Sequence, residues 1–220
     1  MPDVHVPHLD EHDEETASAA VTGPAVHAPK SRGKSLLKIA LEVVLISTGV
    51  FLGLAGEQWR ENAQHRELAE QTLKRFQTEI AANRKAVAGV TDYHAAKRKE
   101  LHAYFDADAK QRQSMSIGLR GVQVAFVEHT AWDVAVASAA LAYLDADLAF
   151  AISHVYITQD NLTQLTRGFL QSMYINPPTT NTTAFLGAVT VYYDDVVLIE
   201  PQLLKMYDEL LPRISKTLGD

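Results

Sequence analysis

The feature that most constrains this chain is the apolar stretch at residues 36–56, which reads LLKIALEVVLISTGVFLGLAG. Residues 43–56 carry no charged side chain, and apolar residues occur on every side of the helix that the stretch predicts. Counted from Ile39, about 17 residues form a helix roughly 25 Å long, close to the hydrocarbon thickness of a bilayer. We therefore expect a transmembrane helix. A buried core helix of a soluble protein and a cleaved signal peptide are the alternatives.

Polar residues at the two ends of this stretch predict how the helix meets the membrane surface. Lys38 can extend towards the headgroups, and it precedes Glu42 by four residues, so the two can pair on the helix. Trp59 and Arg60 follow the stretch, where an aromatic ring and a cation suit the interface. We expect Lys38, Trp59 and Arg60 to anchor the helix at the interface.

One face of the predicted span combines small residues with a carboxylate. Gly49 and Gly53 form a G-x-x-x-G motif, and Gly56 and Glu42 lie on the same helical face. Small residues let a second helix backbone approach closely, and an intramembrane carboxylate prefers protein to lipid. This face therefore predicts association inside the membrane, either with a second copy or with another membrane protein.

Residues 1–35 predict a disordered tail, because they contain no aromatic residue and are rich in acidic residues and histidine. Their later part is basic: Lys30, Arg32 and Lys34 precede the span. By the positive-inside rule this cluster keeps the N-terminus cytoplasmic and sends the C-terminal domain outwards. Basic residues also follow the span, which weakens the asymmetry.

A heptad-like apolar stripe predicts that the helix continues through residues 57–110 as a long juxtamembrane helix. Its positions are separated by alternating steps of four and three, with Gly89 as the weakest helix former. They are Ala69, Leu73, Phe76, Ile80, Asn83, Val87, Val90, His94, Lys97, Leu101 and Tyr104. The stripe could be the seam of a homomeric coiled coil or the core face of an intrachain bundle. Its polar members favour the bundle.

Residues 111–220 predict the rest of a helical bundle. The segment 121–127 could be a short strand, but it has no partner strand, so we expect a loop. Helices are expected from an N-cap at Thr130 to residue 144, from Asp145 or Asp147 to about residue 174, and over 182–217. The last is rich in β-branched residues, which also suits a strand, and Pro201 should kink or divide it. The fold class is all-α, with one N-terminal transmembrane helix continuing into a long helix that packs in a helical bundle.

Composition and motifs exclude several chemistries. A net charge of −7 disfavours nucleic-acid binding, and the absence of cysteine excludes disulfides, thiol nucleophiles and cysteine-ligated zinc. No phosphate-binding loop or familiar catalytic motif is present. The remaining candidates are polar residues within or near the stripe, which could face inwards: Glu79, Asn83, His94, Glu128 and His129. We assign no catalytic residue, metal or cofactor.

Several short motifs carry a family resemblance. The span is followed by Glu57-Gln58-Trp59-Arg60, then by Glu79-Ile80 with Asn83, by Tyr93-His94 and by Thr130-Ala131-Trp132. In this order the motifs resemble a family of uncharacterised bacterial single-span membrane proteins that have a long juxtamembrane helix and an all-helical soluble domain. The resemblance implies a bacterial inner-membrane setting and supplies no established activity.

The expected function is therefore that of a membrane-anchored binding, scaffold or sensor protein, a subunit or accessory of an inner-membrane complex. Its expected partners are membrane lipid and, through the span, itself or another membrane protein. The C-terminal domain is expected in the periplasm. The alternative is an enzymatic or metal-binding helical bundle anchored to the membrane.

Overall fold

The computed structural model describes residues 32–118, 121–175 and 182–219. The chain divides into two compact units, Met1–Gly53 and Leu54–Asp220. All regular structure among the described residues is helical, which confirms the all-α prediction. The tail predicted at residues 1–35 falls almost wholly outside the described residues.

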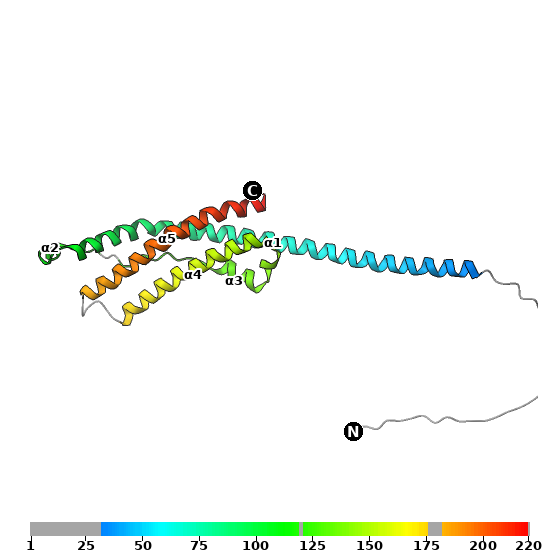
Figure 1. Cartoon of the computed structure of the whole chain (residues 1–220), viewed down its shortest axis with the longest axis horizontal. Helices are drawn as coiled ribbons and strands as arrows, with labels where there is room; N and C mark the ends of the chain where they lie inside the picture. The colour runs from blue at the N-terminus through cyan, green and yellow to red at the C-terminus, as the bar shows by residue number, and fades with distance from the viewer. Residues whose placement is uncertain (1–31, 119–120, 176–181, 220) are drawn as a thin grey trace, which may run out of the picture. The chain divides into compact units, whose positions relative to one another are not determined.

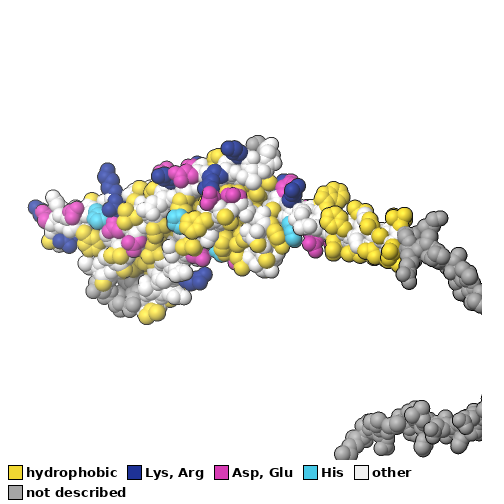
Figure 2. Space-filling model, turned by 45° about the vertical axis from the view of Figure 1, so that its right-hand side comes forward, with side chains coloured by type: hydrophobic (Ala, Val, Ile, Leu, Met, Phe, Trp, Pro, Cys, Tyr) yellow, Lys and Arg dark blue, Asp and Glu magenta, His cyan; other side chains and the backbone are white. Residues whose placement is uncertain are grey.

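The first unit, as far as it is described, is the beginning of helix α1 (Arg32–Asp106). From Leu36 onwards all of its side chains are exposed; Leu45 is 71% exposed and Phe51 is 69% exposed. Apolar side chains cover this surface (Figure 2). By length and composition, α1 and helix α5 (Thr182–Leu218) could each cross a membrane, but only in α5 is part of the apolar stretch, about a third, buried inside the protein.

The second unit begins within α1, whose inner face follows the predicted stripe. Eight of its members are buried: Leu73, Phe76, Ile80, Asn83, Val87, Val90, His94 and Leu101. The helix continues through Gly89 and ends at Asp106, four residues before the predicted end. A short helix α2 (Ala109–Ser114) follows, and its N-terminus is capped by the Asp108 carboxylate, which accepts from the Gln111 amide at 2.8 Å.

The segment between α2 and α3 (Thr130–Ala137) has no regular structure in residues 115–118 and 121–129, as expected of a loop. His129, rather than the predicted Thr130, precedes the first turn of α3. The single helix expected up to residue 144 is interrupted. Ala139 adopts a left-handed conformation, with φ of 54°, and a short 3₁₀ helix η1 (Ala140–Tyr143) follows.

Helix α4 (Ala146–Ile175) packs against α5, and the two run alongside the second-unit part of α1 (Figure 1). The Asp145 carboxylate caps α4 by accepting from the Leu148 amide at 3.0 Å. The β-branched run at the start of α5 is helical, as predicted, and α5 is not divided at Pro201, because the helix includes both Pro201 and Pro212.

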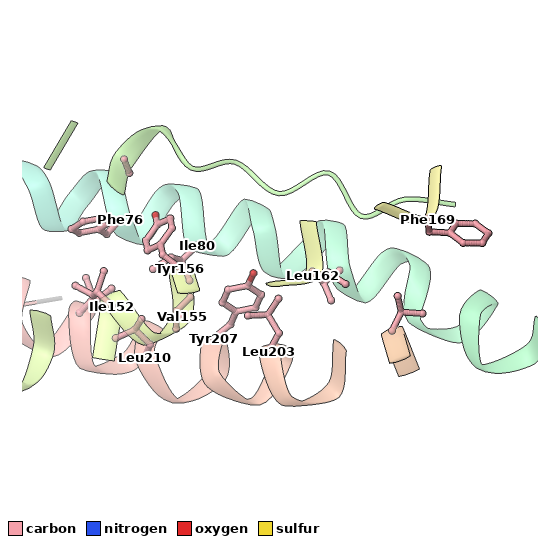
Figure 3. Packing of buried hydrophobic residues seen from close by; sticks show 14 of the residues in the cluster. Phe76, Ile80, Ile152, Val155, Tyr156, Leu162, Phe169, Leu203, Tyr207 and Leu210 are labelled. Carbon is pink, nitrogen blue, oxygen red and sulfur yellow. The ribbon is translucent and has the colours of Figure 1, made fainter. Parts of the chain in front are cut away.

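These three helices share one hydrophobic core (Figure 3). Phe76 and Ile80 of α1 meet Tyr156 of α4, with the Phe76 and Tyr156 ring centroids 5.7 Å apart. Leu203 and Tyr207 of α5 are fully buried on the facing side. The core leaves several polar side chains of α1 buried, and these define the candidate site.

Candidate functional site

Two buried polar residues of α1, Asn83 and His94, bind an extended segment of the chain, residues 121–129, which we call the strap, and Glu79 binds the start of α3 just beyond it. The strap runs alongside α1, and no helical or strand hydrogen bond is formed by its residues 121–127 (Figure 3). Val122, Ala125 and Val127 pack against the core, whereas Phe126 is 83% exposed. A buried backbone needs hydrogen-bond partners, and α1 supplies them with side chains.

Asn83 binds both backbone groups of one strap residue, the amide and the carbonyl of Glu128. Its Oδ1 accepts from the Glu128 amide at 2.7 Å, and its Nδ2 donates to the Glu128 carbonyl at 2.8 Å. Nδ2 also lies 3.2 Å from Oε1 of Gln159 on α4. Asn83 is 1% exposed, so this pairing explains how an amide is accommodated in the apolar stripe.

Glu79 binds the start of α3. Its Oε2 accepts from the Ala131 amide at 2.7 Å, and its Oε1 accepts from the Tyr156 hydroxyl at 2.6 Å. A carboxylate is favourable there, because the first amides of a helix have no partner within the helix. Burial, and then the hydrogen bond to Glu79, raise the pKa of Tyr156, so its hydroxyl remains a donor.

His94 binds the middle of the strap. Its Nε2 lies 2.6 Å from the Gln123 carbonyl oxygen, and its Nδ1 lies 2.7 Å from Oε1 of Glu200 on α5. His94 is 1% exposed and Glu200 is fully buried. The rings of Tyr93 and Tyr193 lie 5.9 and 5.3 Å from the imidazole, centroid to centroid.

The order of these contacts fixes the direction of the strap. Glu79, Asn83 and His94 ascend α1, whereas their backbone partners descend from Ala131 through Glu128 to Gln123. The Tyr93 hydroxyl, one residue before His94, binds the beginning of the strap by donating to the Gly121 carbonyl at 2.9 Å. The polar side chains of α1 therefore take the place of a neighbouring strand for a segment that runs antiparallel to the helix.

Glu128 and His129, the other two polar candidates, lie at the end of the strap. Glu128 takes part through its backbone, and the residue is exposed. His129 Nδ1 lies 3.0 Å from Oδ1 of Asp133, and its Nε2 lies 3.4 Å from Oδ1 of Asp160. The five predicted polar residues therefore line one segment, and each pairs with the backbone or with one or two side chains.

This arrangement bears on the metal-binding alternative. Among residues 32–118, 121–175 and 182–219, no three histidine or acidic side chains are grouped so that they could hold a metal ion. The buried partners Tyr156, Gln159 and Tyr207 extend the network through hydrogen bonds, with Tyr207 donating to Gln159 Oε1 at 2.8 Å. The geometry organises the fold around the strap.

Two residues of this network, Gln159 and Glu200, are not among the predicted site residues, although their positions carry a signal in the sequence. Gln159 interrupts the apolar face of α4 between Val155 and Leu162, and Glu200 ends the apolar run VVLI just before Pro201. A polar residue at a core position is a recognisable exception. Their partners could not be read from spacing, because Glu200 lies 106 residues from His94.

The residues predicted for membrane contact lie on exposed parts of α1. Glu42, Gly49, Gly53 and Gly56 are all exposed, and a Cβ built on each glycine would meet nothing within 4 Å. In this region the described chain supplies no neighbour for that face.

The predicted interface anchors are also exposed. Lys38 and Glu42 form no ion pair in the structure, although their spacing would allow one. Trp59 is 79% exposed. Arg60 donates from Nε to Oε2 of Glu57 at 3.1 Å.

The chain was compared with protein-family models, curated proteins and solved structures, and none of the three comparisons found a match.

Proposed function

We propose that this chain is a membrane-anchored helical binding protein: a scaffold, a sensor or an accessory subunit of an inner-membrane complex. In this proposal, residues 36–56 are a single transmembrane helix, and the second unit is a helical bundle that recognises a partner. The observation that carries the proposal is the unburied apolar surface of α1. About 18 successive residues without a polar face are costly in water and favourable in a bilayer.

The second apolar helix supports a single span rather than two. The inner face of α5 packs in the core through residues such as Tyr193, Leu203 and Tyr207. Inserting α5 into lipid would remove these residues from the core and expose the buried Glu200 carboxyl to hydrocarbon. We therefore assign the membrane to α1 alone.

The absence of cysteine makes the topology directly measurable. We propose a cytoplasmic N-terminus and a periplasmic second unit. Single-cysteine variants Ser18→Cys and Gln171→Cys would be treated with a membrane-impermeant maleimide after permeabilisation of the outer membrane. Labelling of Gln171→Cys before lysis, and of Ser18→Cys only after lysis, is expected. The opposite labelling pattern would show that the topology is the reverse of the one proposed. Extraction of the protein from membranes by alkaline carbonate would refute the transmembrane helix.

The partner within the membrane is proposed to bind the face formed by Glu42, Gly49, Gly53 and Gly56. Ile46 lies on that face, and Phe51 lies on the opposite side of the helix. Oxidative crosslinking in membranes should therefore join Ile46→Cys, and not Phe51→Cys, to a second copy. Capture of Ile46→Cys by a different protein would identify a heteromeric complex.

Large side chains on the glycine face test the same contact. The double variant Gly49→Ile, Gly53→Ile should weaken the oligomer or complex in mild detergent, because branched side chains keep the backbones apart. The matched control is Val44→Ile with Phe51→Ile, away from this face. Unchanged crosslinking of the glycine variant would eliminate this face as the association surface.

A further inference from the structure

We propose that His94 and Glu200 form a clasp that holds the strap closed by means of one shared proton. The clasp would make the exposure of the core beneath the strap depend on pH. The inference concerns the second unit alone, so it stands apart from the proposed membrane span and its partner.

The hydrogen-bond geometry shows how many protons the His94–Glu200 pair holds. The Gln123 carbonyl oxygen can only accept, so His94 Nε2, 2.6 Å away, must carry hydrogen. Nδ1 faces a carboxyl oxygen of Glu200 at 2.7 Å, and this contact also needs a proton between its two atoms. The pair is therefore an imidazolium with a carboxylate, or a neutral imidazole with a carboxylic acid. Both forms hold one proton more than a neutral histidine beside an ionised glutamate.

Removing that proton would leave a nitrogen lone pair facing a carboxylate in a buried site. His94 is 1% exposed and Glu200 is 0% exposed, so water cannot replace the lost bond without structural opening. The strap is the part that can yield, since residues 121–127 have no helical or strand hydrogen bonds. The Asn83 and Glu79 contacts at its other end do not depend on this proton.

The groups around the clasp do not supply an alternative titration near neutral pH. From α5, Tyr192 and Tyr193 approach the imidazole, and burial raises the pKa of each, so both stay neutral. From α1, Tyr93 carries Lys97 near its ring, and Lys97 is paired with Glu100. Residues 121–127 of the strap contain no titratable side chain; the titratable residues of the strap, Glu128 and His129, lie at its other end, where His129 pairs with Asp133 and Asp160. The packed part of α4 beside Tyr192 offers Thr166 and Phe169, which do not titrate.

The sign of the pH effect follows from the proton count. For side chains exposed to water, the reference pKa values are about 4.3 for glutamate and about 6.5 for histidine, and these apply to an open state. Between these values the open and closed states hold the same number of protons, so opening does not depend on pH. Above about 6.5 only the closed state keeps the proton, and the opening equilibrium should rise by up to tenfold per pH unit. Opening would uncover the core surface that Val122, Ala125 and Val127 cover.

Because the chain has no native cysteine, a single introduced thiol can report whether the strap opens. Ala125→Cys places a thiol on the half-buried side of the strap, and the neighbouring Phe126→Cys places one at an exposed position. The full chain in detergent would be labelled with a maleimide between pH 5.5 and 8.5. The ratio of the two rates removes the pH dependence of the thiol itself. We expect a constant ratio below about 6.5 and an increase of up to tenfold per pH unit above it. A ratio that is flat across the whole range overturns the clasp.

Glu200→Gln tests whether the shared proton, rather than the contact between residues 94 and 200, causes the pH dependence. A glutamine amide can donate to Nδ1 of a neutral imidazole, so the strap should stay closed above about pH 6.5 and lose the rise in opening there. His102→Gln, which removes an exposed histidine bound to Asp194, should keep the wild-type response. A Glu200→Gln protein with the wild-type pH slope would refute the proposal.

If that variant fails to fold, nitrogen-15 NMR of wild-type His94, together with the carbon-13 shift of the Glu200 carboxyl, would show which protons the pair holds. A neutral imidazole beside an ionised carboxylate at pH 7.5 would also refute it.

Discussion

At the scale of single residues, this protein stabilises its fold by pairing Glu79, Asn83 and His94, the buried polar residues in or beside the α1 stripe, with specific partners. Asn83 occupies a core position because it binds both backbone groups of Glu128. Glu79 does so because it receives the Ala131 amide and the Tyr156 hydroxyl. Removing one partner of such a pair costs more than a typical surface change, because the other remains buried and unsatisfied.

Tyr156→Phe tests this at the Glu79 carboxylate. The change removes the hydroxyl that donates to Glu79 at 2.6 Å and keeps the ring. We expect a loss of about 1.5–3 kcal/mol in the free energy of unfolding, as for hydrogen bonds to charged groups. Urea denaturation of the full chain in detergent would measure it. Tyr174→Phe is the control, since Tyr174 is 87% exposed, and it should stay within about 0.5 kcal/mol of wild type. Equal effects of the two changes would contradict this account.

Asp194 forms ion pairs with Arg98 and His102, and the strength of these ion pairs depends on pH. Partial burial opposes ionisation, but hydrogen bonds from Arg98 at 2.6 Å and His102 at 2.8 Å outweigh it, and the pKa of Asp194 is lowered. A lowered pKa stabilises the folded state above the unfolded value of about 3.9, and this contribution disappears as the pH falls through the folded value.

Asp194→Asn should therefore destabilise the protein at pH 7 and have little effect near pH 2. Because the contact is partly exposed, the expected loss is about 0.5–1 kcal/mol. The matched control is Asp195→Asn, at the next position of α5, where the structure shows no such partner. Unfolding curves at the two pH values would separate the variants. A pH-independent effect of Asp194→Asn would point to packing rather than charge.

At the scale of elements, α5 shows how tertiary packing overrides local preferences. Its β-branched run and its two internal prolines disfavour a helix, yet it is helical from Thr182 to Leu218. Its buried face, which includes Val196, Leu203 and Leu210, spans both sides of Pro201. Burial along that face offsets the hydrogen bond that Pro201 cannot make.

Pro201→Ala tests the cost of this proline. Alanine restores an amide that can donate to the Val197 carbonyl and removes the clash of the proline ring. Since Pro201 is exposed, the change should stabilise the protein, by up to about 3 kcal/mol. Thermal unfolding would show a higher midpoint than wild type, whereas Gln202→Ala, at the adjacent exposed position, should produce only a small shift. A lower midpoint for Pro201→Ala would mean that the proline itself supports the local geometry.

At the scale of the whole molecule, two helices are apolar enough to cross a membrane, and we propose that only α1 does so. Leu45 of α1 and Val191 of α5 are similarly exposed, at 71% and 61%. Both helices are long and apolar enough to cross a membrane. They differ in burial, because part of the apolar stretch of α5 packs inside the protein and that of α1 does not.

Leu45→Arg and Val191→Arg form a matched pair for this question. An arginine at the centre of a span opposes insertion by about 2.5–3.5 kcal/mol, whereas an arginine on a surface in water costs little. We expect Leu45→Arg to reduce the membrane-integrated fraction and Val191→Arg to leave it unchanged. Carbonate extraction with immunoblotting would measure both fractions. Loss of integration with Val191→Arg would favour two spans and contradict the proposed arrangement.

Much of the secondary structure could be predicted from the sequence because helix periodicity is local. The stripe from Leu73 to Leu101 and the long helices near 146–174 and 182–217 follow from spacing, caps and prolines. The break at Ala139 was not predictable in this way, since alanine is a strong helix former and its left-handed conformation is imposed by the turn into η1. The polar candidates were found from the sequence, but their role in binding the strap was not.

The sequence by itself determined that the chain is helical and that one long helix carries a continuous apolar surface, because both depend on residues a few positions apart. Only the tertiary structure decided that this part of α1 remains unburied while the apolar face of α5 enters a core. It also decided the partners of the buried polar groups. His94 meets Glu200 across 106 residues, and the strap reaches α1 through backbone atoms that carry no sequence signal. Such contacts are selected by packing and by the hydrogen bonds that buried polar groups require, which are properties of the whole fold.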